Sequence, residues 1–194
     1  TSTVPVLLLE AAPLTLRGVM GERAAPLPPY VTRRVLGGVA LALDHLHACG
    51  YAHSDVKAAN ILIFETPRHR LTKKSINDFE HAWCPKLADL GGVVSCVASG
   101  RQPGTEVTTW AYRAPELVYG AEDWSARVDC WSLGIVAVEL ATNSPNLLAI
   151  DKANLPQTIR DFLGRPSAED ERAFRMLPNF RPLASRRAAL TLRS

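Results

Sequence analysis

The sequence predicts a mainly α-helical fold of the α+β class, in which two long helices form the centre and a few short strands accompany them. Residues 30–49 carry apolar side chains at every third or fourth position, which places one apolar stripe along a helix. Residues 128–141 are apolar almost all round, which indicates a helix buried in the core. The short apolar run at residues 61–64 predicts a strand, and residues 86–88 predict another. The stripe consists of Val31, Val35, Val39, Leu43 and Leu46.

The N-terminal part adds smaller elements in front of the first long helix. Residues 6–9 form a short apolar run, interpreted as a buried strand that leaves into a linker at residues 10–13. Residues 18–29 are rich in glycine and proline and predict a short helix or a loop. Gly50 follows the long helix as its C-terminal stop.

Three further segments are expected outside the core. Residues 65–85 are polar and basic and predict an exposed insert; an acidic partner is conceivable for it, but a solvated loop is the simpler interpretation. Residues 91–104 contain four glycines and predict a loop. Residues 159–163 predict a weaker helix, and residues 183–194 form an atypical, arginine-containing tail.

Composition narrows the class of protein. The chain has 194 residues, 47% of them hydrophobic and 21% charged, which is typical of one globular domain. A net charge of +3 gives no basis for nucleic-acid binding, and no apolar stretch is long enough to span a membrane. The four cysteines form no C-x-x-C pair, and no signal peptide is expected. We therefore expect an intracellular protein, cytoplasmic or nuclear, with reduced cysteines.

The string HSDVKAANIL, residues 53–62, carries the strongest chemical signal. It lies in a loop between the first long helix and a strand, so that Asp55, Lys57 and Asn60 can point to one place. Phosphoryl transfer needs such a set: a carboxylate that orients the attacking hydroxyl, a lysine that neutralises the phosphate, and an amide that holds a metal ion. Taken alone, the string is also compatible with an ordinary polar turn.

Three more strings follow in order. KLADLG, residues 86–91, presents Asp89 after a short strand, where a carboxylate can bind magnesium beside nucleotide phosphates. WAYRAPE occupies residues 110–116. VDCWSLG, residues 128–134, opens the buried helix with Asp129, which must be satisfied by hydrogen bonds. Asp129 can accept backbone N–H bonds from the loop at residues 53–62, cap its own helix, or do both.

Together these four strings resemble the catalytic loop, the metal-binding Asp-Phe-Gly, the Ala-Pro-Glu and the buried-helix motif of eukaryotic-type serine/threonine protein kinases. The resemblance runs from about residue 6 to about residue 182. It implies a protein-kinase-like C-terminal lobe with the small N-terminal β lobe largely absent, since no glycine-rich loop and no strand lysine precede Val6. Residues 1–194 are then a partial kinase domain, made of the hinge and the large lobe.

The resemblance assigns the catalytic and metal-binding positions. It makes Asp55 the catalytic base and Lys57 the lysine that contacts the phosphate. Thr109 matches the threonine that braces these two side chains. Asn60 and Asp89 match the ligands of Mg²⁺.

The resemblance also assigns the nucleotide site. Glu10 and Ala12 match hinge positions whose backbone groups bond the adenine of ATP, and Leu62 packs beneath the adenine ring. His53 and Leu90 belong to the hydrophobic stack that joins the two lobes. The implied cofactors are ATP and Mg²⁺, with Lys57, Asn60 and Asp89 also contacting the bound nucleotide.

Details of the strings favour a branch of the family. Lys57, two residues after the aspartate, is the serine/threonine pattern, and residues 106–116 resemble the cyclin-dependent, MAP and SR-protein kinases. Ser54 replaces an arginine that usually pairs with a phosphate on the activation loop. Arg113 suggests a preference for proline after the acceptor residue, because it can occupy a carbonyl that would otherwise bond the next N–H of the substrate. A structural Arg113 with basic substrates is the alternative.

Two functions follow from these features. The first is a serine/threonine kinase that transfers the γ-phosphate of ATP to protein hydroxyls, here as an incomplete catalytic domain. The second is a pseudokinase or scaffold, which binds partners through the large lobe without catalysis. Expected partners are protein substrates with serine or threonine acceptors and a possible regulatory protein, with no membrane and no nucleic acid.

Overall fold

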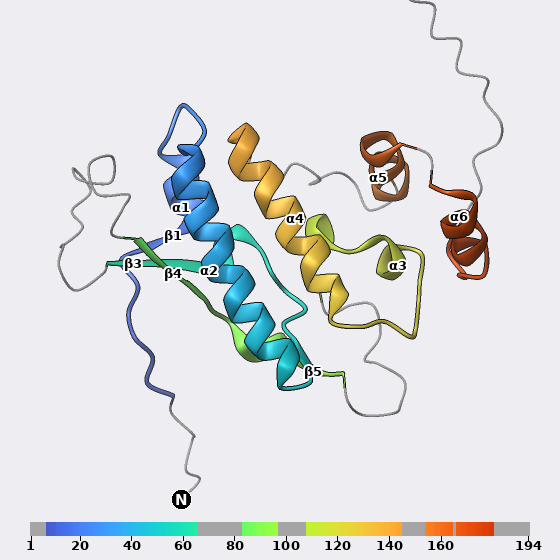
Figure 1. Cartoon of the computed structure of the whole chain (residues 1–194), viewed down its shortest axis with the longest axis horizontal. Helices are drawn as coiled ribbons and strands as arrows, with labels where there is room; N and C mark the ends of the chain where they lie inside the picture. Colours follow the sequence, from blue (N-terminus) through green and yellow to red (C-terminus); the bar gives the residue numbers. More distant parts are fainter. Residues whose placement is uncertain (1–6, 66–82, 97–107, 145–153, 165, 181–194) are drawn as a thin grey trace, which may run out of the picture.

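A pair of long helices forms the centre of the fold. The computed structural model describes residues 7–65, 83–96, 108–144, 154–164 and 166–180. Helix α2 (Pro29–Ala48) and helix α4 (Arg127–Thr142) pack against each other and cross the middle of the molecule (Figure 1). This confirms the prediction of a mainly helical fold with these two helices at its centre.

Short antiparallel strands lie on one side of the helix pair (Figure 1). Strands β1 (Leu14–Thr15), β3 (Ile61–Glu65) and β4 (Trp83–Leu87) form a sheet in the order β1-β3-β4. Strands β2 (Tyr51–Ala52) and β5 (Val94–Ser95) form a second small sheet at the other end of α2. The two small sheets flank residues 53–60, the loop that carries the first chemical string.

Smaller helices complete the fold. Helix α1 (Leu16–Gly21) starts at the side chain of Thr15, whose hydroxyl accepts a hydrogen bond from Gly18 N at 3.1 Å. Helices α3 (Pro115–Val118), α5 (Leu155–Leu163) and α6 (Ala168–Arg175) lie on the opposite side of α4 from the strands (Figure 1). In the part of the chain that the structure describes, no helix is long and apolar enough to cross a membrane.

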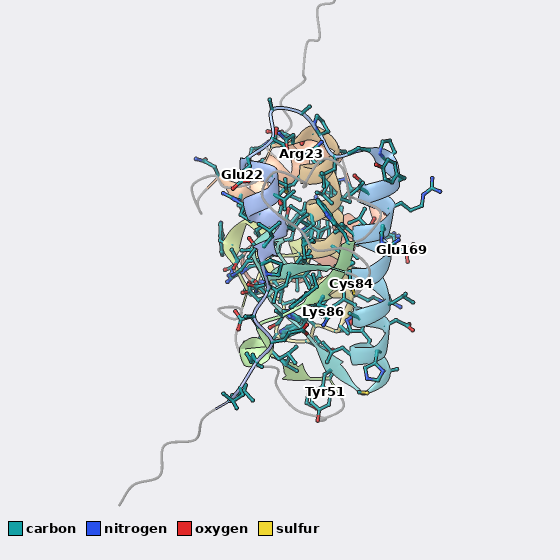
Figure 2. All side chains as sticks on the ribbon, turned by 90° about the vertical axis from the view of Figure 1, so that its left-hand side faces the viewer. Glu22, Arg23, Tyr51, Cys84, Lys86 and Glu169 are labelled. Atoms are coloured by element: carbon teal, nitrogen blue, oxygen red, sulfur yellow. The ribbon has the colours of Figure 1, made fainter. Side chains whose placement is uncertain are left out.

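The apolar stripe of α2 faces the core as predicted. Val31, Val35, Val39 and Leu43 are buried, and side chains fill the space between this helix and β4 (Figure 2). The helix ends at the predicted place because Gly50 adopts φ +83°, a conformation that favours glycine.

The prediction for residues 6–9 was wrong where the structure describes them. Leu7, Leu8 and Leu9 form no strand and are between 79% and 91% exposed. A buried strand needs a hydrogen-bonding neighbour. Within the described residues, the first sheet begins only at Leu14, so these leucines have no strand beside them.

The bounds of the predicted insert at residues 65–85 were also wrong. Glu65 ends β3, and residues 83–85 begin β4, so only residues 66–82 lie between the two strands, outside the described residues. Pro85 is tolerated in β4 because this strand lies at the edge of its sheet. Trp83 is fully buried, and its carbonyl accepts a hydrogen bond from Arg34 Nε at 2.6 Å.

Helix α4 is buried but is not uniformly apolar on its core face. Asp129, Ser132 and Glu139 are buried together with its valine, isoleucine and leucine side chains. Buried polar groups of this kind are stable only when they are hydrogen-bonded. Each of the three side chains forms a hydrogen bond with a residue outside α4.

Candidate functional site

Asp129 of α4 binds the backbone of the candidate catalytic loop, residues 53–60. Asp129 is fully buried, and its carboxylate accepts hydrogen bonds from His53 N at 2.7 Å and from Ser54 N at 2.8 Å. His47 of α2 lies with Nε2 2.8 Å from the same carboxylate. The predicted role of Asp129 as acceptor for this loop is thus confirmed.

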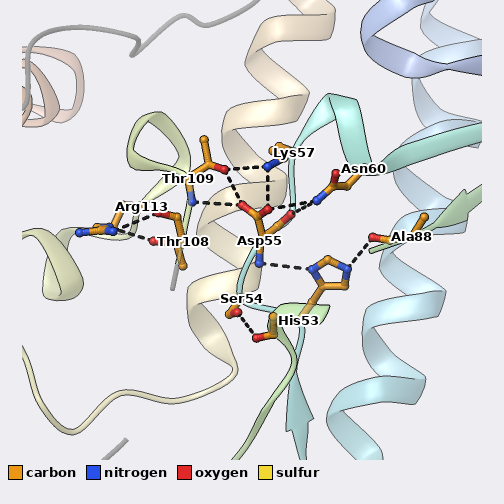
Figure 3. Close-up of polar contacts among 10 residues, drawn as sticks. His53, Ser54, Asp55, Lys57, Asn60, Ala88, Thr108, Thr109 and Arg113 are labelled. Atoms are coloured by element: carbon orange, nitrogen blue, oxygen red, sulfur yellow. Dashed lines mark hydrogen bonds and ion pairs between the residues drawn. The ribbon is translucent and has the colours of Figure 1, made fainter. Parts of the chain in front are cut away.

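Asp55 lies at the centre of a compact polar network (Figure 3). Its Oδ2 accepts a hydrogen bond from Lys57 Nζ at 2.6 Å, and its Oδ1 accepts bonds from Thr109 Oγ1 at 2.6 Å and Thr109 N at 3.1 Å. Lys57 Nζ also donates to Thr109 Oγ1 at 2.8 Å. The structure therefore brings together three residues that lie up to 54 positions apart in the chain.

The surroundings of Asp55 keep it ionised. Burial raises the pKa of its carboxyl, but hydrogen bonds from Lys57 and Thr109 and the positive charge of Lys57 outweigh that effect, so the pKa lies below its ordinary value. A carboxylate with a lowered pKa is a weak proton acceptor but a permanent hydrogen-bond acceptor. Asp55 is thus suited to orient a hydroxyl group.

Asn60 joins the same network and links it to the segment of Asp89. Its Nδ2 donates to Asp55 O at 2.9 Å and to Asp55 Oδ2 at 3.2 Å, which leaves the amide oxygen as the atom that can bind a cation. Its backbone oxygen accepts a bond from Ala88 N at 2.9 Å. Asp89, the next residue, is exposed and adopts φ +66°. Two oxygen donors on neighbouring segments fit a hard cation such as Mg²⁺.

The residues expected to bind the nucleotide lie around β3 and β4. Glu10 Oε2 accepts a hydrogen bond from Lys86 Nζ at 2.5 Å, and Lys86 pairs across the sheet with Leu62. The Lys86 ammonium also lies 4.2 Å from the ring centre of Phe64. Leu62 and Ala12 are half-buried. Glu10 and Leu62 are thus brought to one region through Lys86.

The two residues assigned to the hydrophobic stack differ in their exposure. His53 is fully buried, and its Nε2 lies 3.0 Å from Ala88 O (Figure 3). Leu90 is 62% exposed. His53 therefore already connects the catalytic loop with the segment of Asp89, while the side chain of Leu90 is open to solvent.

Sequence reasoning missed two polar pairs that each contain a buried carboxylate. Tyr112 donates its hydroxyl to both carboxylate oxygens of Glu139, at 3.1 and 3.0 Å. His47 binds Asp129, as described above. A glutamate inside the apolar run of residues 128–141 was the signal that could have revealed the first pair, because a buried carboxylate requires a partner.

Two cavities lie away from these residues. One, of about 410 Å³, is lined by Glu116, Tyr119 and Trp131 together with α5 and α6. The other, of about 960 Å³, is a groove between α2 and α4 lined by small and apolar side chains such as Leu36, Ala137 and Gly134. Neither cavity includes a residue that the sequence motifs single out for nucleotide or metal binding.

Comparison with known proteins identifies the family. The protein kinase domain matches residues 2–181 of this chain. A serine/threonine-protein kinase of Saccharomyces cerevisiae is 31% identical over 163 residues, which are 84% of this chain and 24% of the relative. Cyclin-dependent kinase G1 of Arabidopsis thaliana is 29% identical over 166 residues, which are 84% of this chain and 24% of the relative.

A third relative widens the branch. Mitogen-activated protein kinase 10 of Arabidopsis thaliana is 28% identical over 141 residues, which are 73% of this chain and 30% of the relative. The chain thus spans less than a third of the length of each of these three relatives. Their names confirm the predicted similarity to the branch of cyclin-dependent and MAP kinases.

Proposed function

Because this chain belongs to the protein kinase domain family, we propose that residues 1–194 supply the hinge and large lobe of a serine/threonine kinase. The reaction is transfer of the γ-phosphate of ATP to a serine or threonine hydroxyl of a protein. The observation that carries this proposal is the network of Asp55, Lys57, Thr109 and Asn60. Phosphoryl transfer depends on positioning and charge stabilisation, and this network supplies both.

Asp55 and Lys57 have distinct roles in this reaction. Asp55 accepts a hydrogen bond from the attacking hydroxyl and directs its oxygen at the phosphorus atom; its lowered pKa suits orientation. Lys57 places a positive charge beside the phosphate oxygens. Thr109 holds both side chains in position through the bonds of its hydroxyl.

Asn60 and Asp89 would hold Mg²⁺, which neutralises the charge of the phosphates when bound. The Asn60 amide oxygen and the exposed Asp89 carboxylate support this assignment. For the adenine of ATP, backbone groups of Glu10 and Ala12 supply the hydrogen bonds, and Leu62 supplies an apolar contact. The contact of Glu10 with Lys86, which pairs across the sheet with Leu62, supports a hinge at this place.

The substrate preference follows from Arg113. Its Nε and Nη2 donate to Thr108 Oγ1 at 2.9 Å and to Thr108 O at 3.0 Å, and its guanidinium lies 4.4 Å from the Trp110 ring centre. A carbonyl occupied in this way supports a preference for Ser-Pro or Thr-Pro acceptors.

We place the protein in the cytoplasm or nucleus, since its four cysteines are free thiols. A regulatory protein is a further expected partner.

Substitution of Asp55 tests the proposal. In a full-length protein that contains this chain, Asp55→Asn should lower phosphate transfer to a serine or threonine peptide by roughly a hundredfold or more, since the orienting carboxylate is lost. Transfer of ³²P from ATP is the measurement, and circular dichroism checks that the fold is kept. Asp44→Asn, on the exposed face of α2, is the matched control.

The scaffold hypothesis makes the opposite prediction. If wild type and Asp55→Asn both lack transfer but bind the same protein partners, the large lobe acts as a pseudokinase. If Asp55→Asn retains near-normal turnover, Asp55 does not orient the acceptor and the assignment of the site is wrong.

A further inference from the structure

We propose that Ser54 is a positioning residue that couples the catalytic loop to the segment carrying Asp89. The inference rests on the proposed function, because it concerns the regulation of the same site. Ser54 Oγ donates a hydrogen bond to Gly92 O at 2.5 Å, across 38 positions of the chain. The bond joins the residue before Asp55 to the third residue after Asp89.

The conformation of Ser54 shows that this position is tightly held. Ser54 is 1% exposed and adopts φ +64°, a region that a serine rarely occupies. Its N–H donates to Asp129 Oδ1 at 2.8 Å while its hydroxyl bonds Gly92 O. Strained backbone persists only where the surrounding contacts fix it, and here two hydrogen bonds from one residue do so.

The segment around Asp89 is fixed on both sides but exposed in the middle. Before Asp89, Ala88 N donates to Asn60 O at 2.9 Å. After it, β5 pairs with β2, and Cys96 N donates to Gly50 O at 2.8 Å. Between these ends, Asp89, Leu90 and Gly91 are exposed. The Ser54 bond to Gly92 therefore supplies a cross-link directly after this exposed stretch.

The bond connects two parts that must act together. Asp55 and Asn60 sit on one side of it, and Asp89 on the other, so its loss lets Asp89 move relative to the Asp55 network. The Ser54 hydroxyl touches neither reacting atoms nor metal ligands directly, and it acts through the backbone. Both groups in the bond are neutral, so the coupling requires no charged group and no covalent modification.

Hydrogen exchange of the protein without ligands tests the coupling. Ser54→Ala removes the hydroxyl, and we expect the amides of residues 90–94 to exchange about tenfold faster, since this stretch then opens locally. Ser54→Gly removes the same hydroxyl, and glycine adopts a positive φ without strain. It is therefore the second test variant if Ser54→Ala folds poorly. Unchanged exchange at residues 90–94 in both variants would overturn the proposal.

Two control variants separate coupling from general loss of stability. Ser95→Ala removes an exposed hydroxyl in the neighbouring strand β5 and should leave exchange at residues 90–94 unchanged. Leu140→Ala creates a core cavity in α4 and lowers global stability, but it should not selectively speed exchange at residues 90–94. Selective acceleration in Leu140→Ala equal to that in Ser54→Ala would also overturn the proposal.

Magnesium dependence gives a second readout. In the full-length protein, Ser54→Ala should raise the Mg²⁺ concentration for half-maximal ADP binding by about three- to tenfold, because the position of Asp89 is less restricted. Transfer at saturating Mg²⁺ should change much less. A wild type that binds no ADP with Mg²⁺ contradicts the proposed function, whereas faster exchange at residues 90–94 would still support the coupling. If the wild type binds ADP and Ser54→Ala has the same Mg²⁺ midpoint, the coupling is contradicted, while the proposed function is not.

Discussion

Two lysine–carboxylate pairs of nearly equal length lie in very different surroundings. Lys57 Nζ and Asp55 Oδ2 are 2.6 Å apart, with side chains 23% and 16% exposed. Lys86 Nζ and Glu10 Oε2 are 2.5 Å apart, with side chains 46% and 63% exposed. The first pair is further bonded by Thr109 and Asn60, whereas the second is exposed at the N-terminal segment. Distance alone therefore does not measure what either pair contributes.

The difference in burial between the two pairs shows which side of the candidate site is held firmly by the protein itself. The Asp55 side is fixed by side chains from three separate segments and by the buried Asp129 beneath it. The side of Glu10 and Leu62 is fixed by a short sheet and a solvated pair. Solvated pairs are weak because water and salt screen them. Under the proposed function, the half of the site that serves phosphoryl transfer is thus preformed, and the half that binds the nucleotide is more loosely held.

The largest effect is expected when the support of the Asp55 side is removed. Asp129→Ala leaves the buried N–H groups of His53 and Ser54 without their acceptor, and we expect it to lower the free energy of unfolding by about 3–5 kcal/mol. Urea unfolding is the measurement. Asp123→Ala, an exposed aspartate, should change the free energy of unfolding by less than about 0.5 kcal/mol. A similar loss in both variants would show that Asp129 has no special role.

A direct comparison of the two pairs comes from double-mutant cycles. Using Asp55→Asn with Lys57→Met, we expect a coupling free energy of about 1.5–3 kcal/mol, since the bond is charge-assisted and shielded from water. Using Glu10→Gln with Lys86→Met, we expect about 0.2–1 kcal/mol. Urea unfolding of each set of four proteins gives these values. Equal coupling energies would remove the distinction between the two halves.

The nucleotide half also depends on how β4 sits against α2. A Cβ atom added at Gly38 would lie 2.5 Å from Pro85 Cγ, so Gly38→Ala should force β4 outward and lower the free energy of unfolding by about 1–3 kcal/mol. Gly37→Ala has nothing within 4 Å and should raise it by about 0.5–1 kcal/mol through helix propensity. Thermal unfolding distinguishes the neighbouring variants, and a stabilising Gly38→Ala would contradict the close contact.

The smallest effect concerns pH. The pKa of Asp55 is lower in the folded protein than its ordinary value, so its contribution to stability is present above the unfolded pKa and is lost as the pH falls through the folded pKa. The difference in free energy of unfolding between wild type and Asp55→Asn should therefore be largest above about pH 5 and shrink below it. Urea unfolding at several pH values measures this difference.

Glu116 provides a control of opposite sign. Burial raises the pKa of its carboxyl, so its contribution to stability is present at low pH and is lost as the pH rises through the folded pKa. The difference between wild type and Glu116→Gln should change in the opposite direction to that of Asp55→Asn. Parallel pH profiles for the two residues would contradict the assigned causes.

The sequence predicted the parts of the fold that depend on one segment at a time. The stripe from Val31 to Leu46 predicted α2, and the long apolar run predicted α4, because hydrophobic periodicity follows directly from helix geometry. The partnership of Asp129 with the loop at residues 53–62 was also predictable, since a buried carboxylate needs donors and the resemblance to the kinase family supplied the loop as the donor.

What the sequence did not predict depends on pairing between distant segments. Residues 7–9 have the composition of a strand, but strand formation depends on a neighbour that composition does not specify. Conversely, residues 83–85 were assigned to a polar insert, although pairing with β3 makes them strand. The bond of Ser54 to Gly92 was equally hidden, because it depends on the packing of two loops.

The position of Asp129 also has a consequence for the order in which the chain assembles. Its partners His53, Ser54 and His47 lie 76, 75 and 82 positions away in the chain. Docking of α2 on α4 closes nearly the same loops, because His47 lies near the end of α2 and residues 53 and 54 follow it closely. The bonds that hold residues 53 and 54 therefore cannot form in a nascent chain until Asp129 has been synthesised.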